Sequence, residues 1–232
     1  MIKQNDDFSY EYIKLDNFNI ESGICNYKDN IVFIGGKCYK SYGRCNGYWT
    51  YEDTCSLFDT DTEKVQNFPY LVVQRANPAV VYFNQKLMVI GGKFKEKPLR
   101  SIEVFDEENN RWMLKSIFLN DARSKHSAVE CNGKLYIVGG DEECCINSIE
   151  VFSPESDCFE KLSSTNFLYK PYCWFVHENS IWRIGGKSTK ESAERSNESL
   201  QRYDVAGDEW HAEPPFPILI EDVGACIVSR DF

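Results

Sequence analysis

The stretch Leu87-Met88-Val89-Ile90-Gly91-Gly92, with Ser101-Ile102-Glu103-Val104-Phe105-Asp106 and Trp112 after it, decides the fold of this chain. An apolar run ends at a glycine pair, and a serine then opens a second run that ends at an aromatic residue. A bulky residue follows seven positions after that aromatic. Short runs of β-branched and aromatic residues bounded by glycine are typical of strands. The stretch therefore predicts three consecutive strands, the last of which carries Trp112.

The same pattern occurs four times in the 232 residues. Its glycine pairs are Gly35-Gly36, Gly91-Gly92, Gly139-Gly140 and Gly185-Gly186, separated by 56, 48 and 46 residues. Its aromatic residues are Phe58, Phe105, Phe152 and Tyr203, and the residues seven positions later are Val65, Trp112, Phe159 and Trp210. A period near fifty residues with constant internal spacing indicates a repeat array.

The residue types give this repeat a structural meaning. Glycine at the end of a strand permits a sharp turn or a close approach of another backbone, so the glycine pairs are expected to be architectural. The aromatic residue and the bulky residue after it, such as Phe105 and Trp112, are expected to fill the space between neighbouring sheets. Each repeat then depends on stacking against its neighbours.

A repeat of this length, with a strand ending at Gly-Gly and a late tryptophan, resembles the kelch motif, in which each repeat forms one four-stranded blade of a β-propeller. The resemblance implies an all-β fold with four complete blades, in repeats at approximately 20–70, 71–118, 119–165 and 166–216. Repeats two and three match best, with Arg75 and Arg123 ahead of the first strand. The first repeat departs at Val65, and the fourth has Tyr169 at the arginine position.

The ends of the chain leave the number of blades open. Residues 8–15 resemble the last strand of an earlier blade, and residues 223–229 resemble the first strand of a later one. The two pieces could form a partial fifth blade, or the chain could belong to a longer propeller. Kelch proteins often carry BTB and BACK domains, and we expect neither within these repeats. Exposed strand edges at an open ring could also be covered by dimerisation.

Composition limits the functional classes. An apolar share of 42% supports a single globular domain. No apolar stretch reaches the roughly 20 residues that span a bilayer, and the polar, acidic N-terminus does not resemble a secretory signal. We therefore expect a cytoplasmic protein with no membrane partner. The formal net charge of −10 argues against a nucleic-acid partner.

Cysteines and histidines do not form a recognisable metal site. The ten cysteines lack the short C-x-x-C spacing of a zinc site, and His126, His177 and His211 are scattered. Reduced thiols are expected in the absence of a secretory signal. Cys144 and Cys145 could form an oxidation-sensitive pair, although their acidic neighbours favour ordinary loop thiols. The sequence predicts no metal and no cofactor.

The connections between the second and third strands of each repeat, here the b–c loops, are long and unlike one another, which favours them as the binding face. They comprise Lys37–Thr54, Lys93–Arg100, Asp141–Asn147 and Lys187–Glu198. The first is rich in the residue types that anchor protein interfaces, and its candidates are Tyr42, Arg44, Tyr48 and Trp49. The alternative is that these rings pack back on an atypical first blade.

A second candidate group precedes the first strands of the repeats and comprises Arg75, Asn77, Arg123, Lys125, His126 and Tyr169. The kelch resemblance implies peptide contacts for the basic members of this group, at the channel mouth. The alternative is that the arginines form salt bridges and hold the ring together. If the group binds, charge reversal of Arg75, Arg123 and Lys125 should abolish capture of a partner without lowering thermal stability.

Three functional classes follow. The resemblance implies a non-enzymatic protein-binding propeller, with substrate recognition for a cullin-type ubiquitin ligase adaptor as the leading role. The alternative is an actin-binding protein or a stand-alone scaffold or decoy. A copper or small-molecule enzyme is the third class, and it lacks support because no nucleophile–base pair, phosphate loop or clustered histidines occur.

Overall fold

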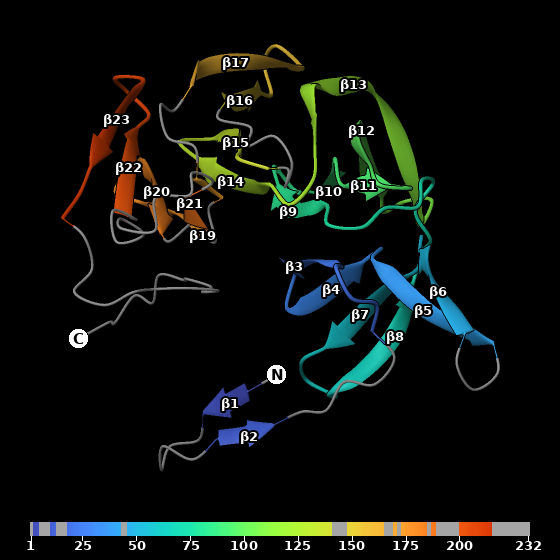
Figure 1. The fold of residues 1–232 in the computed structure, drawn as a ribbon. Coiled ribbons are helices and arrows are strands. Elements are labelled where there is room, and N and C mark those ends of the chain that lie inside the picture. The colour runs from blue at the N-terminus through green and yellow to red at the C-terminus, as the bar shows by residue number, and fades with distance from the viewer. Residues whose placement is uncertain are drawn as a thin grey trace.

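The computed structural model describes residues 2–4, 10–12, 18–42, 46–140, 148–164, 169–170, 173–184, 187–188 and 200–214. Every regular element in these ranges is a β-strand. Figure 1 shows the sheets following one another around an arc in chain order, from blue near the N-terminus to red near the C-terminus. The described residues contain no helix that could cross a lipid bilayer.

Four antiparallel sheets have the strand order of propeller blades. Blade 1 contains β3 (Gly23–Tyr27), β4 (Asn30–Ile34), β7 (Cys55–Asp59) and β8 (Lys64–Phe68). Blade 2 contains β9 (Ala79–Phe83), β10 (Lys86–Ile90), β12 (Lys97–Asp106) and β13 (Arg111–Arg123), and β11 (Lys93–Phe94) pairs with the start of β12. Blade 3 contains β14 (Ser127–Cys131), β15 (Lys134–Val138), β16 (Ser148–Ser153) and β17 (Cys158–Ser164). Blade 4 contains β19 (Cys173–His177), β20 (Ser180–Ile184), β22 (Leu200–Asp204) and β23 (Glu209–Ala212).

The seven-residue spacing in the sequence is a cross-strand pairing in the structure. The aromatic residue of the third strand lies directly opposite the bulky residue of the fourth strand in every blade. These pairs are Phe58 with Val65, Phe105 with Trp112, Phe152 with Phe159, and Tyr203 with Trp210. A tight antiparallel turn fixes this register, so the repeat keeps its spacing because the hairpin keeps its length.

The core lies between consecutive blades rather than at a single centre. One buried cluster joins blades 1 and 2, a second joins blades 2 and 3, and a third joins blades 3 and 4. Between blades 1 and 2, the ring centroids of Phe105 and Trp112 are 5.3 Å apart, and Phe68 of blade 1 packs on Phe105 at 4.6 Å. The aromatic residues of the repeat therefore fill the space between blades, as their pattern predicted.

The glycine pairs allow a strand end to lie close to the backbone that leads into the next blade. Gly91 has a φ of +57°, and a Cβ atom placed on it would lie 2.6 Å from the carbonyl oxygen of Arg123. The N–H of Gly92 donates to that same carbonyl at 2.9 Å. Glycine is required here because a side chain would separate the two backbones. Gly185 and Gly186 lie outside the described residues.

The predicted first b–c loop and the predicted strands at the two ends of the chain differ from, or lie partly outside, what the structure describes. The predicted loop Lys37–Thr54 is largely a hairpin of β5 (Lys37–Tyr42) and β6 (Asn46–Tyr51). Within the predicted strand 8–15, only β2 (Tyr10–Tyr12) is described as a strand. It pairs with β1 (Ile2–Gln4), which the sequence pattern did not indicate. The predicted strand 223–229 lies outside the described residues.

Candidate protein-interaction surface

The arginine that precedes blade 2 is buried in an ion pair. The Arg75 guanidinium donates to the Glu103 carboxylate at 2.7 Å, and neither side chain has exposed surface. Arg75 also donates to the carbonyl oxygens of Gly91 and Ser101 at 2.7 and 3.1 Å. The Glu103 carboxylate accepts the backbone N–H groups of Val72 and Val73 at 2.7 and 3.1 Å. These hydrogen bonds join the segment that leaves blade 1 to β12 and to the glycine that follows β10 in blade 2.

The same network recurs one blade later with the same geometry. Arg123 donates to the Glu150 carboxylate at 2.7 Å and to the carbonyl oxygens of Gly139 and Ser148, each at 3.1 Å. Glu150 accepts the backbone N–H groups of Asn120 and Asp121 at 2.6 and 3.0 Å. The repetition identifies the arginines as structural parts of the repeat, because a buried ion pair with satisfied hydrogen bonds fixes one arrangement of two blades.

The expectation that Arg75, Arg123 and His126 contact a partner is therefore wrong for this structure, because all three side chains are buried. Charge reversal at position 75 or 123 is now expected to lower thermal stability, since the new carboxylate would face a buried carboxylate. Burial and the nearby Arg123 guanidinium lower the pKa of His126 to about 3, so this ring is neutral near pH 7.

The remaining candidates ahead of the first strands are Asn77, Lys125 and Tyr169, and their surroundings differ. Asn77 and Lys125 occupy equivalent left-handed positions, with φ values of 50° and 54°. The Asn77 side chain donates to the Glu21 carboxylate at 2.7 Å, which holds it within the fold. Lys125 is exposed. Tyr169 begins β18 (Tyr169–Lys170), which pairs with β21 (Lys187–Ser188), and its side chain is outside the described set.

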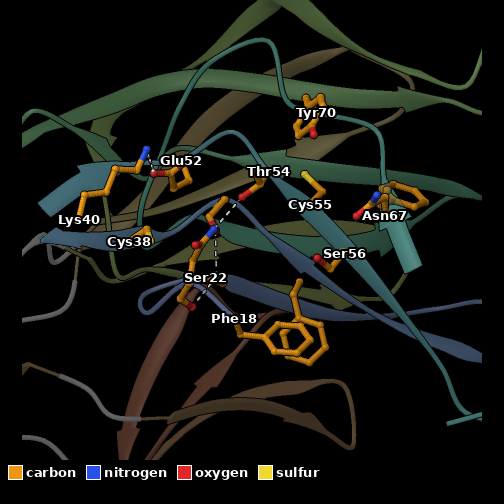
Figure 2. Close-up of a pocket in the computed structure, with 14 residues that line it drawn as sticks. Phe18, Ser22, Cys38, Lys40, Glu52, Thr54, Cys55, Ser56, Asn67 and Tyr70 are labelled. Atoms are coloured by element: carbon orange, nitrogen blue, oxygen red, sulfur yellow. Dashed lines mark hydrogen bonds and ion pairs between the residues drawn. The ribbon is translucent and has the colours of Figure 1, made fainter. Parts of the chain in front are cut away.

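Blade 1 lacks the ion pair and has a pocket in its place. Asn19 lies sixteen residues before Gly35, as Arg75 does before Gly91, and Ser56 takes the position of Glu103. The Asn19 amide donates to the Gly35 carbonyl at 2.9 Å and to the Thr54 hydroxyl at 2.8 Å. A pocket of about 320 Å³ remains beside them. Figure 2 shows it, with Ser56, Asn67 and Tyr70 on one side and Lys40 and Glu52 on the other.

The hairpin β5–β6 exposes aromatic side chains. Tyr39 lies directly opposite Trp49, with ring centroids 5.2 Å apart, and each residue is 51% exposed. Tyr48, 45% exposed, lies on the other face of the hairpin, opposite Lys40. Tyrosine and tryptophan offer large contact areas with few rotatable bonds, which suits them to bind another protein.

A network from blade 2 fixes the base of the hairpin. The Tyr51 hydroxyl donates to the Glu96 carboxylate, and the backbone N–H of Glu96 donates to Tyr51 Oη at 3.0 Å. Lys37 and Lys93 also bind the Glu96 carboxylate at 3.0 and 3.2 Å. These partners, the Tyr51 hydroxyl first, lower the pKa of Glu96 to about 2. The ring of Tyr51 packs against Phe94 with centroids 5.6 Å apart.

The structure therefore places Trp49 beside Tyr39 on one face of the hairpin and Tyr48 on the other face. Tyr42 pairs with Asn46 in the hairpin through its backbone, and its side chain is outside the described set. Arg44 lies outside the described residues. A concave region of about 420 Å³ runs along the hairpin, lined by Trp49, Tyr51, Phe94 and Lys95 among others. Within the described ranges, no three His, Cys, Asp or Glu side chains are placed to hold a metal ion.

Sequence reasoning did not identify the roles of Glu96, Glu103 and Glu150. A signal for the last two was present, because glutamate occurs two residues before the aromatic of the third strand only in the repeats that have the leading arginine. Repeats one and four have Asn19 with Ser56 and Tyr169 with Gln201 at these positions. Glu96 carries no such signal, since its partners come from a hairpin that was expected to be a loop.

Comparisons with known proteins agree with this architecture. The family model described as the KLHDC2/KLHL20/DRC7 Kelch-repeats domain matches residues 22–217. Kelch-like protein 35 of Mus musculus is 26% identical over 64% of this chain and 24% of its own length. Human Kelch repeat and BTB domain-containing protein 8 is 25% identical over 85% of this chain and 32% of its own length. Beta-scruin of Limulus polyphemus is 24% identical over 62% of this chain and 16% of its own length.

A solved structure shares the fold. The structure of YjhT superimposes with a TM-score of 0.64 at 12% sequence identity, covering 85% of this chain and 66% of that one. This chain spans about a third or less of the length of the relatives named above. The family model covers most of the chain, and the blades carry the repeat that it describes. The chain belongs to the kelch-repeat family of β-propeller domains.

Proposed function

We propose that this propeller binds a protein partner through the aromatic face of the hairpin β5–β6, without chemistry of its own. The single observation that supports this best is the contrast within the hairpin. Its base is held by the Glu96 network, whereas Tyr39 and Trp49 on the same structure are each 51% exposed. A hairpin that is held in one arrangement before binding loses less conformational entropy when a partner binds, and its exposed rings supply the contact area.

Substrate recognition for a cullin-type ubiquitin ligase is the role that we propose for this binding. The similarity to a Kelch repeat and BTB domain-containing protein supports it. The alternative is a stand-alone scaffold or decoy, or a protein that binds actin filaments. The two roles share the binding surface and differ in what accompanies the captured partner.

Affinity capture from cell extract tests the surface and the role together. The intact chain is compared with a Tyr39→Ser/Trp49→Ser variant, and Tyr70→Ser serves as the matched control because Tyr70 is 66% exposed outside the hairpin. We expect a partner that the double variant loses and the control retains. Capture that is equal in all three proteins would refute the hairpin as the binding surface.

The composition of the captured material separates the roles. A cullin subunit recovered with the partner supports the ligase role. Co-sedimentation with purified actin filaments, lost in the double variant, supports the alternative. Thermal unfolding of each variant is measured in parallel, so that loss of capture is compared only among folded proteins.

A further inference from the structure

Strand β13 of blade 2 exposes apolar side chains on the outer surface. Leu114 is 48% exposed and Phe118 is 50% exposed, and the nearby Val72 is 58% exposed. Leu114 lies directly opposite Glu103, and Phe118 lies opposite Ser101. The N–H of Val72 donates to Glu103. The three residues, here the β13 patch, therefore border the outer end of the buried Arg75–Glu103 pair.

The equivalent position in blade 3 is polar, so the architecture does not require an apolar patch. Around the Arg123–Glu150 pair, the residue opposite Glu150 is Lys161, and the residue opposite Ser148 is Ser164. Asn120 takes the place of Val72, since its N–H donates to Glu150. Lys161 forms an ion pair with Asp121 at 2.8 Å. Both junctions have the same buried ion pair, and only one of them has an apolar rim.

Leu114 and Phe118 of this patch also lie on a strand edge that no other described strand pairs with. Among the described strands, β13 pairs only with β12, and its 13 residues make it the longest strand. Figure 1 shows β13 on the outside of blade 2. Lys115, Ser116 and Ile117 have no register partner in β12. An unpaired strand edge is a template for pairing with another strand, and proteins usually protect such edges with charges or bulges. Between Leu114 and Phe118 this edge has one charged residue, Lys115, and a register shift against β12.

We propose that this edge pairs with the same edge of a second copy of the chain, antiparallel about a twofold axis at Ser116. In this register Leu114 lies opposite Phe118 of the partner subunit, and Lys115 lies opposite Ile117 of the partner subunit. The two serines at position 116 meet at the axis. Directly opposed residues share a face of the sheet, and no like charges are opposed.

The self-complementary pattern favours a second copy over an unrelated strand. A twofold interface uses one surface patch on both subunits, so each residue must suit its opposite across the axis. The pairing of Leu114 with Phe118 meets this condition twice, once on each side of Ser116. The edge lies on a different blade from the aromatic hairpin, so a dimer leaves the proposed partner surface as described.

Sedimentation equilibrium over a range of concentrations tests the dimer. The variant Leu114→Lys/Phe118→Ser gives β13 the residues that blade 3 has at these positions, and Val65→Lys is the control because Val65 is 45% exposed on β8. We expect a wild-type dimer whose Kd rises at least about tenfold in the double variant. The control should associate as the wild type does. A monomeric wild type, or an unchanged Kd in a folded double variant, would overturn the proposal.

Oxidative cross-linking tests the register. Ser116→Cys places two thiols at the axis, whereas Lys115→Cys places each thiol opposite an isoleucine. We expect the first variant to form covalent dimers above the wild-type background and the second to form fewer. Equal cross-linking in the two variants would refute the axis at Ser116.

Discussion

The guanidinium of Arg75 and the carboxylate of Glu103 lie 2.7 Å apart with no exposed surface on either side chain. Arg75 lies in the link between β8 and β9, whereas Glu103 lies in β12 and also binds the backbone that leaves blade 1. Removing one partner leaves the other charge buried and unpaired. Substitutions at these two residues therefore test how far the ion pair holds neighbouring blades together.

Replacing Arg75 with methionine is expected to lower the free energy of unfolding by roughly 3–5 kcal/mol, because Glu103 loses its counter-charge. The variant Arg75→Met/Glu103→Gln should recover part of this loss, since no charge then remains buried. Urea denaturation monitored by tryptophan fluorescence measures both. A single variant as stable as the wild type would show that the pair does not join the blades.

Lowering the pH is expected to weaken the fold through His126. Its pKa falls from an ordinary 6.5 to about 3 in the folded protein, so the unfolded chain binds a proton more readily. The contribution is complete above pH 6.5 and is lost as the pH falls towards 3. Between pH 7.5 and pH 5 the loss is about 2 kcal/mol. His126→Gln should flatten this part of the stability curve, and an unchanged slope would contradict the assignment.

Alanine at Gly91 and alanine at Gly133 should differ in cost. Both glycines have positive φ, at +57° and +72°. A Cβ atom at Gly91 would meet the Arg123 carbonyl and the His126 ring, whereas nothing lies within 4 Å of one at Gly133. We expect about 1 kcal/mol of backbone strain at Gly133 and a clearly larger loss at Gly91. Equal losses in thermal unfolding would mean that only backbone strain matters.

Much of this fold could be predicted from the sequence, because its repeats depend on local spacing. The pairing of Phe105 with Trp112 follows from a turn of constant length, and the glycine pairs follow from steric need. The role of Arg75 was harder to predict. Arg75 and Glu103 lie far apart in the sequence, so nothing local indicated a buried pair rather than a surface charge. The available signal was that the arginine and the glutamate occur together in repeats two and three and are both missing from repeats one and four. The hairpin β5–β6 was not predicted, because its aromatic residues are also compatible with a binding loop.

Introducing the arginine–glutamate pair into blade 1 tests whether these two positions are coupled in every repeat. We expect Asn19→Arg and Ser56→Glu to destabilise the protein singly, because each places a charge beside the 320 Å³ pocket without its partner. Together they should show a favourable coupling of about 1 kcal/mol or more in a double-mutant cycle. Additive effects would show that blade 1 cannot form the pair.

Loosening the hairpin should reduce its protection without unfolding the propeller. Tyr51→Phe removes the hydroxyl that joins Glu96 in two hydrogen bonds, while the ring contact with Phe94 remains. We expect faster hydrogen exchange across residues 37–51 and unchanged exchange in blade 3. Faster exchange in both regions would mean that the change affects the whole fold.

The Glu96 network has a mechanical consequence. The hairpin grows from blade 1, but the carboxylate that secures it belongs to blade 2. A load applied to Trp49 is therefore divided between two sheets that also share a buried core. If a partner binds there as proposed, the interface between blades 1 and 2 would therefore carry part of any force that the partner exerts on the hairpin.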